Sequence, residues 1–567
     1  MRDNRVLFLF IFMISAFSIL IGRAFYLQVI NWQDYRLNVL DMSTRVYKIP
    51  GRRGDIYDKN GNLLAWNEKR YKLNLTSENL DSNEEEKLKG ILKYSNVDIN
   101  NLLDDLNFNK EADLKISSTT AKKVDSMDNI VVYENYIRKY SHDSLYHILG
   151  YVDNEGVPRT GIEREFNELL KGKEGYKIVT ISPSGYIEST IEQVPSIKGN
   201  DIYLTLDIEL QKKIYDYMEE HNHVGSVIIS EPSNGSILAM VSYPAPNPND
   251  FSRGLSNIEF RRILNDAKSP LLNRSISASF APGSVLKPFI AYSALEYGIS
   301  PEATINTTGR YNLYNSSGNR IATFDDWNLI GHGVVDLVKS LRVSANSYYY
   351  SLGEKIGIDF LYQQAEKYSL TEKTGVDLPG EITGVFPSEE WKRERFGEPW
   401  YPGETVQAFI GQSYIQMTPI QILRYYNILA EHGQYYNFHV YDKTKNSFDE
   451  VINEYDKKLS TSYELDEEYL SYILQGLNEV TSYPGDSQNG GTAYEYFKDA
   501  DYKIAGKTGT AQVSGGKRSH AWFAGFTQEP EKNYSIVVFV ENGGFGSSVA
   551  VPIAREFLDM VMVESRW

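Results

Sequence analysis

The sequence predicts an α+β fold in which helices cover an antiparallel sheet. Two apolar, β-favouring runs at 224–230 and 236–242 are joined by a Glu-Pro-Ser-Asn-Gly loop, which is typical of a hairpin. Helical patterns then dominate to about residue 480. Three strand-like runs with short links, the pattern of an antiparallel meander, precede a final apolar helix at 551–563. Two strands, many helices, three strands and a helix pack as one sheet with helices around it.

Composition excludes several function classes. The 567 residues leave room for two or three domains, and a net charge of -17 argues against nucleic acid, since nothing would neutralise its phosphates. The absence of cysteine excludes disulfides, thiolate metal sites and cysteine nucleophiles. The eight histidines form no metal-ligand pattern, and we interpret His221 and His223 as a solvated surface pair. We therefore expect no metal and no cofactor.

The first residues differ from everything after them. The segment 6–22 carries no charge, and Arg23 follows it. It has the minimum length for a membrane span, exceeds a signal-peptide apolar region, and is not followed by an Ala-x-Ala-like cleavage site. We expect an uncleaved transmembrane anchor at 6–22 after a short cytoplasmic N-terminus at 1–5. Positive charge is balanced on its two sides, so the outside placement of the rest depends on the chemistry below.

Three features precede the sheet. The segment 51–65 carries an Asn-Gly turn between apolar runs, a strong hairpin signal. Residues 77–130 are polar and acid-rich and predict a small accessory lobe. The segment 160–175 is typical of one amphipathic helix closed by glycine. From about Gly199 the sheet-and-helix pattern begins.

The stretch from Phe280 to Phe289 raises the question of function. Ser284 follows a Pro-Gly pair, and Lys287 comes three residues later. In a structural interpretation Ser284 caps a helix and Lys287 is solvated. In a catalytic one they are nucleophile and base, since this spacing places both on one helix face. Spacing alone does not decide, because Ser514 and Lys517 share it.

A serine nucleophile needs further partners. It must lose its proton as it attacks, and a lysine can accept that proton when burial and a nearby cation lower its pKa. We therefore expect a second cation and a relaying hydroxyl near Lys287. The sequence offers Ser344 and Asn346 in a helical stretch, and Lys507, Thr508, Gly509 and Thr510 in a predicted strand.

Each of these elements is weak alone. Ser-x-Asn also begins at Ser77, Ser317 and Ser487, and Lys-Thr-Gly also begins at Lys373, before a Pro-Gly loop. The copy at Lys507, in a predicted strand, is better suited to substrate binding, because an edge strand can bind an extended peptide through backbone hydrogen bonds. Gly509 would let the substrate approach that backbone closely. The Ser514 copy spans two glycines, where no helix would hold the geometry.

In this order Ser-x-x-Lys, Ser-x-Asn and Lys-Thr-Gly are the signature of penicillin-binding proteins and serine β-lactamases. The chain resembles class B penicillin-binding proteins along nearly its whole length, in blocks such as GRRGDIYDKNGNLLA, FAPGSVLKPF, TGVDLPGE and GKTGTAQ. FDDWNLIGHG and EEWKRERFGEPWYPGE are similar to the elongation type of that family. Ser413 stands where the family usually has glycine and Ser141 where it has proline, so we expect local loop differences there.

The resemblance implies a serine-type D-Ala-D-Ala transpeptidase that cross-links peptidoglycan stem peptides through an acyl-enzyme and is acylated by β-lactams. It implies that Ser284 attacks, that Lys287 takes the serine proton, that Ser344 relays a proton to the leaving amine, and that Lys507 tunes the field. Asn346 would hold the substrate.

The same resemblance implies a binding surface on the predicted strand. The Thr508 and Thr510 hydroxyls would bind the terminal carboxylate beside Gly509. The backbone N–H groups of Ser284 and Thr510 would form the oxyanion hole, worth about 3–4 kcal/mol per donor in other enzymes.

The resemblance also implies an organisation and partners. A five-stranded antiparallel sheet with flanking helices would form the extracytoplasmic transpeptidase domain at 199–567, after an elongated pedestal at 23–198 with a head lobe at about 66–140. Expected partners are nascent peptidoglycan strands, a SEDS-family (RodA-like) membrane glycosyltransferase and shape-determining elongation-complex scaffold proteins. The implied role is cell-wall elongation and maintenance of rod shape.

Three other functions fit part of this pattern. A class A β-lactamase needs a Glu-x-x-Leu-Asn loop, and the only similar segment, ending at Asn478, lacks the glutamate. A D,D-carboxypeptidase would pass the same acyl group to water. A silent scaffold would only regulate a polymerase, which the three intact motifs argue against.

Overall fold

The computed structural model describes residues 2–26, 44–513, 515–529 and 532–564. The chain forms two compact units, which we describe separately. The first unit consists of residues 1–53, 67–137 and 171–199, and the second of residues 54–66, 138–170 and 200–567.

A five-stranded antiparallel sheet organises the second unit. Its strands are β9 (Gly225–Ser230), β10 (Ile237–Tyr243), β19 (Ile504–Ala511), β20 (His520–Thr527) and β21 (Ser535–Val540), in the order β10-β9-β21-β20-β19. The predicted hairpin is β9 with β10, and the predicted meander is β19 to β21. The strand β19 therefore lies at the edge of the sheet, with one side of its backbone unpaired within the sheet.

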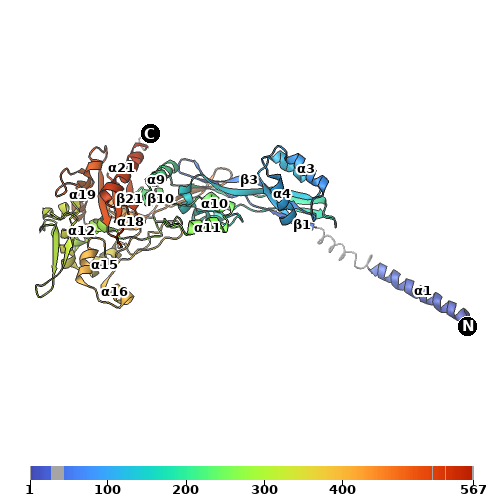
Figure 1. Cartoon of the computed structure of the whole chain (residues 1–567), viewed down its shortest axis with the longest axis horizontal. Helices are drawn as coiled ribbons and strands as arrows, with labels where there is room; N and C mark the ends of the chain where they lie inside the picture. Colours follow the sequence, from blue (N-terminus) through green and yellow to red (C-terminus); the bar gives the residue numbers. More distant parts are fainter. Residues whose placement is uncertain (1, 27–43, 514, 530–531, 565–567) are drawn as a thin grey trace. The chain divides into compact units, whose positions relative to one another are not determined.

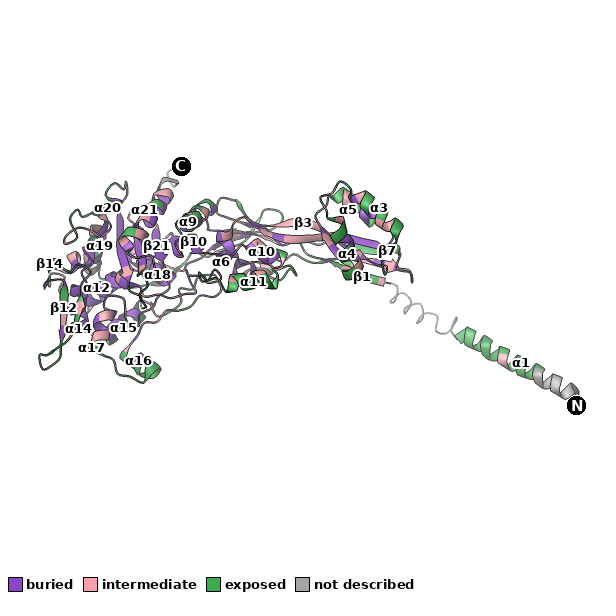
Figure 2. Ribbon diagram, in the orientation of Figure 1, coloured by how far each residue is buried: buried purple, intermediate pink, exposed green. Residues whose placement is uncertain are grey.

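Helices cover both faces of this sheet. Alternate residues of β9 enter different cores, since Val227 and Ile229 pack with α9 (Ile208–Glu220) and α21 (Gly546–Glu564), whereas Ile228 packs in the larger core. That larger core also contains side chains of α12 (Lys287–Glu296), α18 (Pro419–Ala430) and α19 (Glu467–Ser482). Figure 1 shows α9 and α21 close to β10 and β21, and Figure 2 shows the buried interior of this unit in purple. Burial on both faces explains why these strands are continuous apolar runs rather than alternating ones.

The middle of the chain is less helical than its sequence predicts. Between α12 and α19 it contains short antiparallel strands, which are β11 (Ile305–Thr307), β12 (Arg310–Tyr314), β13 (Arg320–Asp325), β14 (Gly333–Val335), β15 (Gln434–Tyr436), β16 (Tyr441–Lys445), β17 (Val451–Glu454) and β18 (Leu459–Ser462). Besides α18, the helices of this stretch are α13 (Leu337–Arg342), α14 (Asn346–Ile356), α15 (Ile358–Lys367), α16 (Glu389–Phe396) and α17 (Pro402–Ala408). Most of these strands are too short and too exposed to produce a recognisable alternation.

The remainder of the second unit contains one confirmed and one wrong prediction. The Asn-Gly turn does join β2 (Ile56–Tyr57) to β3 (Leu63–Leu75), with Gly61 at a φ of 84°. The single helix predicted at 160–175 is instead α7 (Gly161–Glu165) and α8 (Asn167–Leu170), separated by Phe166. The Phe166 ring stacks on Tyr441 with centroids 4.8 Å apart, a tertiary contact that interrupts the helix.

The first unit contains a three-stranded antiparallel sheet and the predicted accessory lobe. The sheet is β1 (Thr44–Ile49), β6 (Gly175–Ile181) and β7 (Ile187–Val194), with β6 in the centre. The lobe is α3 (Ser82–Leu92), α4 (Ile99–Asn109), β4 (Glu111–Leu114) and α5 (Ser118–Asp125). Asp81, Asp98 and Ser117 cap the three helices through side-chain oxygens, and leucines dominate the lobe's core.

The predicted span at 6–22 falls within α1 (Arg2–Phe25), and the side chains of residues 6–9 lie outside the described part. Among the residues that the structure describes, no helix combines the length and hydropathy needed to cross a bilayer.

The remaining elements are β5 (Ile130–Tyr140), β8 (Asp201–Leu204), α6 (Tyr146–Leu149), α10 (Pro248–Arg253), α11 (Asn257–Leu264), α20 (Tyr494–Phe497) and two 3₁₀ helices, η2 (Asp143–Leu145) and η3 (Gly283–Leu286).

Candidate active site

Ser284 lies in η3, the tight turn that leads directly into α12. It does not cap the helix, because the N-cap position belongs to Leu286 and no side chain accepts a hydrogen bond there. The Ser284 side chain is half-buried, and within the described part of the chain its hydroxyl makes no hydrogen bond. The position therefore leaves the hydroxyl available for a reaction.

Lys287 is the first residue of α12, and it is completely buried. Its Nζ donates to the Ser344 carbonyl oxygen at 2.8 Å, to the Ser344 Oγ at 3.3 Å and to the Asn346 Oδ1 at 2.7 Å. A lysine ammonium has three N–H donors, so these acceptors use all of them. The structure thus brings Lys287, Ser344 and Asn346 together.

Burial lowers the pKa of Lys287 from 10.5 to about 7, against the opposing effect of the Asp326 carboxylate. Lys507 is also completely buried, and burial together with the charge of Lys287 lowers the pKa of Lys507 well below its usual value. A general base works best when its pKa lies near the operating pH. Lys287 therefore has the pKa of a base at neutral pH, and the second cation is its electrostatic neighbour.

Ser344 and Asn346 do not lie inside one helix, as the sequence suggested. Ser344 occupies the junction between α13 and α14 with a φ of 57°, and Asn346 is the first residue of α14. A left-handed backbone costs a residue other than glycine about 1–2 kcal/mol. This break between the two helices lets the carbonyl oxygen and the hydroxyl of Ser344 both accept hydrogen bonds from Lys287.

The strand β19 carries Lys507, Thr508, Gly509 and Thr510. The Thr508 Oγ1 lies 2.7 Å from the Thr492 Oγ1, and the Thr510 Oγ1 accepts a hydrogen bond from the Gly546 backbone N–H at 3.1 Å. Because β19 is an edge strand, it can bind an extended chain through its unpaired backbone groups.

Gly509 is required for a different reason from the one expected. A Cβ there would lie 2.9 Å from both the Trp522 Cβ and the Val285 Cγ1, so it would point into the protein rather than toward a ligand. Its absence lets η3 pack directly on β19 and so places Ser284 beside the strand.

Three more glycines make the same junction tight. A Cβ at Gly283 would lie 3.1 Å from the Thr510 carbonyl oxygen, and one at Gly411 would lie 2.2 Å from the Gly283 carbonyl oxygen. A Cβ at Gly546 would lie 2.2 Å from the Gly509 carbonyl oxygen. Backbone therefore packs against backbone around the nucleophile, in a contact that we call the glycine junction (Gly283, Gly411, Gly509 and Gly546).

The second copies of two motifs were also predicted not to act. Ser514 of the second Ser-x-x-Lys lies outside the described residues, and Gly515 and Gly516 after it both have a positive φ. In the second Lys-Thr-Gly, Thr374 lies outside any strand and donates to the Glu381 carboxylate at 2.6 Å. His221 is exposed and His223 half-buried, and their rings stack on one another.

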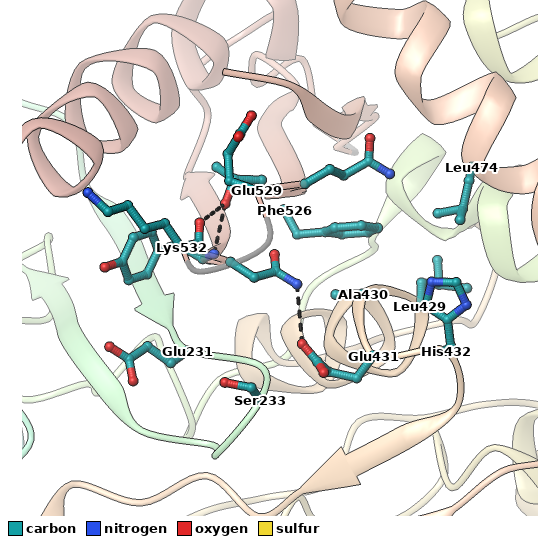
Figure 3. Close-up of a pocket in the computed structure, with 14 residues that line it drawn as sticks. Glu231, Ser233, Leu429, Ala430, Glu431, His432, Leu474, Phe526, Glu529 and Lys532 are labelled. Atoms are coloured by element: carbon teal, nitrogen blue, oxygen red, sulfur yellow. Dashed lines mark hydrogen bonds between the residues drawn. The ribbon is translucent and has the colours of Figure 1, made fainter. Parts of the chain in front are cut away.

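Two features of this unit were given no role in the sequence analysis. Asp326, a buried carboxylate that accepts hydrogen bonds from the start of α14, is one. The other is a cavity of about 470 Å³ at the far end of β20 from Thr510. Figure 3 shows Glu231, Glu431 and Glu529 around it, and no residue of the catalytic cluster lines it.

A half-exposed serine beside a buried lysine, on a sheet with helices over both faces, defines the class of serine enzymes that transfer acyl groups without a histidine. Comparison with family models agrees. The penicillin binding protein transpeptidase domain matches residues 225–559, and the penicillin-binding protein dimerisation domain matches residues 48–204. Because the first match spans more than half of the chain, the chain belongs to the penicillin-binding-protein transpeptidase family.

Known relatives extend the similarity to full length. The peptidoglycan D,D-transpeptidase MrdA of Escherichia coli K12 is 29% identical over 99% of this chain and 94% of its own. The penicillin-binding protein PBP2 of Helicobacter pylori, solved in complex with MreC, is 30% identical, with a TM-score of 0.75 over 92% of this chain and 99% of that one. A chain of a solved peptidoglycan synthase complex, described as coordinating polymerization and crosslinking, is 26% identical. Its TM-score is 0.71, over 98% of this chain and 97% of that chain.

Proposed function

We propose that this chain is a peptidoglycan D,D-transpeptidase of cell-wall elongation. The family and the full-length similarity to MrdA support the assignment. The single observation that carries it is the completely buried Lys287, with a pKa of about 7, one helical turn from the half-buried Ser284.

The reaction begins at the carbonyl carbon between the two terminal D-alanines of a stem peptide. Lys287, in its neutral form, takes the proton of the Ser284 hydroxyl as the Ser284 Oγ forms its bond to that carbon. The peptide C–N bond then breaks, and the departing D-Ala amine receives a proton through Ser344. The amine of a second stem peptide attacks the ester, forms the cross-link and releases Ser284. Lys507 lowers the cost of keeping Lys287 neutral.

Substrate binding is assigned to β19 and its surroundings. The stem peptide lies along the edge of β19, with its terminal carboxylate at the Thr508 and Thr510 hydroxyls and with Asn346 on its amide groups. The developing oxyanion accepts hydrogen bonds from the backbone N–H groups of Ser284 and Thr510. Removal of one such donor costs about 3–4 kcal/mol of transition-state stabilisation in other enzymes.

We also propose a membrane-anchored arrangement. The uncharged segment 6–22 is the anchor, and residues 199–567 are the extracytoplasmic catalytic domain on a pedestal at 23–198. A SEDS-type membrane glycosyltransferase and a shape-determining scaffold protein are the proposed partners. The relatives solved with MreC and in a synthase complex support this choice.

Intact mass spectrometry after incubation with benzylpenicillin tests the acylating serine. The wild-type protein should gain one penicillin, Ser284→Ala should gain none, and Ser514→Ala, which alters the other Ser-x-x-Lys, should gain one. No adduct on the wild type, or an adduct that survives Ser284→Ala, would contradict the proposal. Rapid release of the adduct would indicate a β-lactamase. D-Ala release with and without an acceptor amine then separates transfer to an amine from transfer to water.

A further inference from the structure

Asp326 is a buried carboxylate that belongs to none of the three motifs. It directly follows β13, and only 2% of its surface is exposed. Its Oδ1 accepts hydrogen bonds from the backbone N–H groups of Trp327 at 2.8 Å and Asn346 at 3.1 Å. Its Oδ2 accepts from the Ser347 backbone N–H and from the Ser347 Oγ, both at 2.8 Å. Four donors therefore fix both oxygens.

The first turn of α14 depends on this carboxylate. The first N–H groups of a helix have no partner within the helix, and the residue before it usually supplies one from its side chain. Here that residue is Ala345, which has no side-chain acceptor. Asp326 replaces the missing cap from another segment of the chain, and its negative charge is favourable at a helix N-terminus.

The same turn holds the proposed base. Asn346 donates its backbone N–H to Asp326, and its side-chain oxygen accepts a hydrogen bond from the Lys287 Nζ at 2.7 Å. Ser344, two residues earlier, supplies the other two acceptors of Lys287. A shift in the start of α14 would therefore move every group that fixes the Lys287 ammonium.

We propose that Asp326 is a positioning residue of the active site, which acts through Asn346 to fix Lys287 and through its negative charge to favour the protonated, resting lysine. It does not touch the substrate. This inference rests on the proposed function, since it concerns the base of that reaction.

The charged and titratable groups around Asp326 and Lys287 determine the direction in which loss of Asp326 should shift the pKa of Lys287. The Asp326 carboxylate raises the pKa of Lys287, and the charge of Lys287 in turn lowers the pKa of Lys507 on β19. His332 lies with its Nε2 3.8 Å from the Asp326 Oδ1, and Tyr350 on α14 is also within electrostatic range. Burial by itself would raise the pKa of Asp326, but the neighbouring His332, the hydrogen bonds from Ser347 and the charge of Lys287 outweigh it and lower that pKa. Asp326 is therefore ionised at neutral pH, and its removal should make Lys287 easier to deprotonate.

The test compares Asp326→Asn with Asp325→Asn in the full-length protein. Asp325 is the preceding residue, but its side chain is exposed and pairs with Arg310 on the surface. The rate of acylation by a fluorescent penicillin is measured from pH 5 to pH 9, together with the melting temperature of each protein.

In Asp326→Asn, the acid-side midpoint of the rate profile should move down by about one pH unit, since an opposite charge has been lost near a buried lysine. Acylation above the midpoint should slow about tenfold or more, because the amide has a single oxygen and cannot accept hydrogen bonds at both the Oδ1 and the Oδ2 positions. Asp325→Asn should leave both quantities unchanged. A purely structural role would lower the melting temperature without moving the midpoint, and that result would overturn the proposal.

Two further outcomes keep the test decisive. If the wild type itself is not acylated at Ser284, the proposed function fails, and this inference fails with it. If Asp326→Asn does not fold, Asp326→Glu keeps the charge and displaces it by one methylene. Slower acylation at an unmoved midpoint would then support the proposal, and a wild-type rate would overturn it.

Discussion

The protonation of Lys287 should appear in the stability of the protein as well as in its reactivity. A fall in the pKa of Lys287 from 10.5 to about 7 on folding corresponds to about 5 kcal/mol, the cost of a charged lysine in this buried position. Below pH 7 both the folded and the unfolded protein carry the charge, and the full cost applies. Between pH 7 and 10.5 unfolding takes up a proton, so the free energy of unfolding rises by about 1.4 kcal/mol per pH unit.

Replacing Lys287 by methionine isolates this effect. Methionine has no charge to bury, but it leaves the Ser344 and Asn346 acceptors without a donor, and that cost does not depend on pH. The free energy of unfolding of the wild type, minus that of Lys287→Met, should therefore rise by about 2 kcal/mol between pH 7.5 and pH 9. Lys507 adds to the rise with the same sign, because removal of Lys287 makes its pKa less depressed.

Urea unfolding at the two pH values measures this difference. Tryptophan fluorescence, to which the buried Trp522 beside the glycine junction contributes, follows the transition. A difference between wild type and Lys287→Met that is equal at pH 7.5 and pH 9 would refute the reasoning, because Lys287 would then have the same pKa in the folded and unfolded states.

Three further predictions concern the framework of the site. Ser413→Gly should raise the free energy of unfolding by about 0.5 kcal/mol, since Ser413 is exposed with a φ of 61°; a lower melting temperature would contradict this. Gly509→Ala should cost about 1–3 kcal/mol in urea unfolding and slow penicillin acylation, because its Cβ would collide with Trp522; unchanged acylation would show that η3 tolerates the shift. Glu163→Gln should cost about 3–5 kcal/mol, because it leaves the buried guanidinium of Arg138 without its charged partner; a change below 1 kcal/mol would mean that water compensates that charge.

The parts of the fold set by local sequence were predicted, and those set by distant contacts were not. The strands of the five-stranded sheet are apolar runs between clear turns, so β9, β10 and the final meander could be placed from sequence alone. The helix at 160–175 has a sound local pattern, but Phe166 packs on a residue almost three hundred positions later. Ser413 was noted for its unusual identity, and its left-handed backbone agrees with the glycine that the family prefers.

The same division applies to the candidate site. Motif spacing identified Ser284, Lys287 and Lys507 as candidate site residues, because each is part of a short, recognisable sequence motif. Asp326 lies in the block FDDWNLIGHG, but that string does not show its role, which appears only when the fold places it against the start of α14. The reason for Gly509 was also invisible in sequence, because a glycine that faces inward and one that faces a ligand look the same.

The glycine junction limits how this protein can change by inheritance. Around the nucleophile, Gly283, Gly411 and Gly546 face main chain, and Gly509 faces the Trp522 and Val285 side chains. Any side chain placed at these positions must therefore move the reacting serine or the strand beside it. Selection for weaker reaction with an inhibitor has few routes through these positions that preserve the natural reaction. Substitution meets less resistance where an exposed side chain stands near the site, as Phe545 does beside Gly546. Tolerated substitutions, including those that weaken the reaction with an inhibitor, are therefore expected at exposed positions near the site, and the four glycines of the junction are expected to stay unchanged.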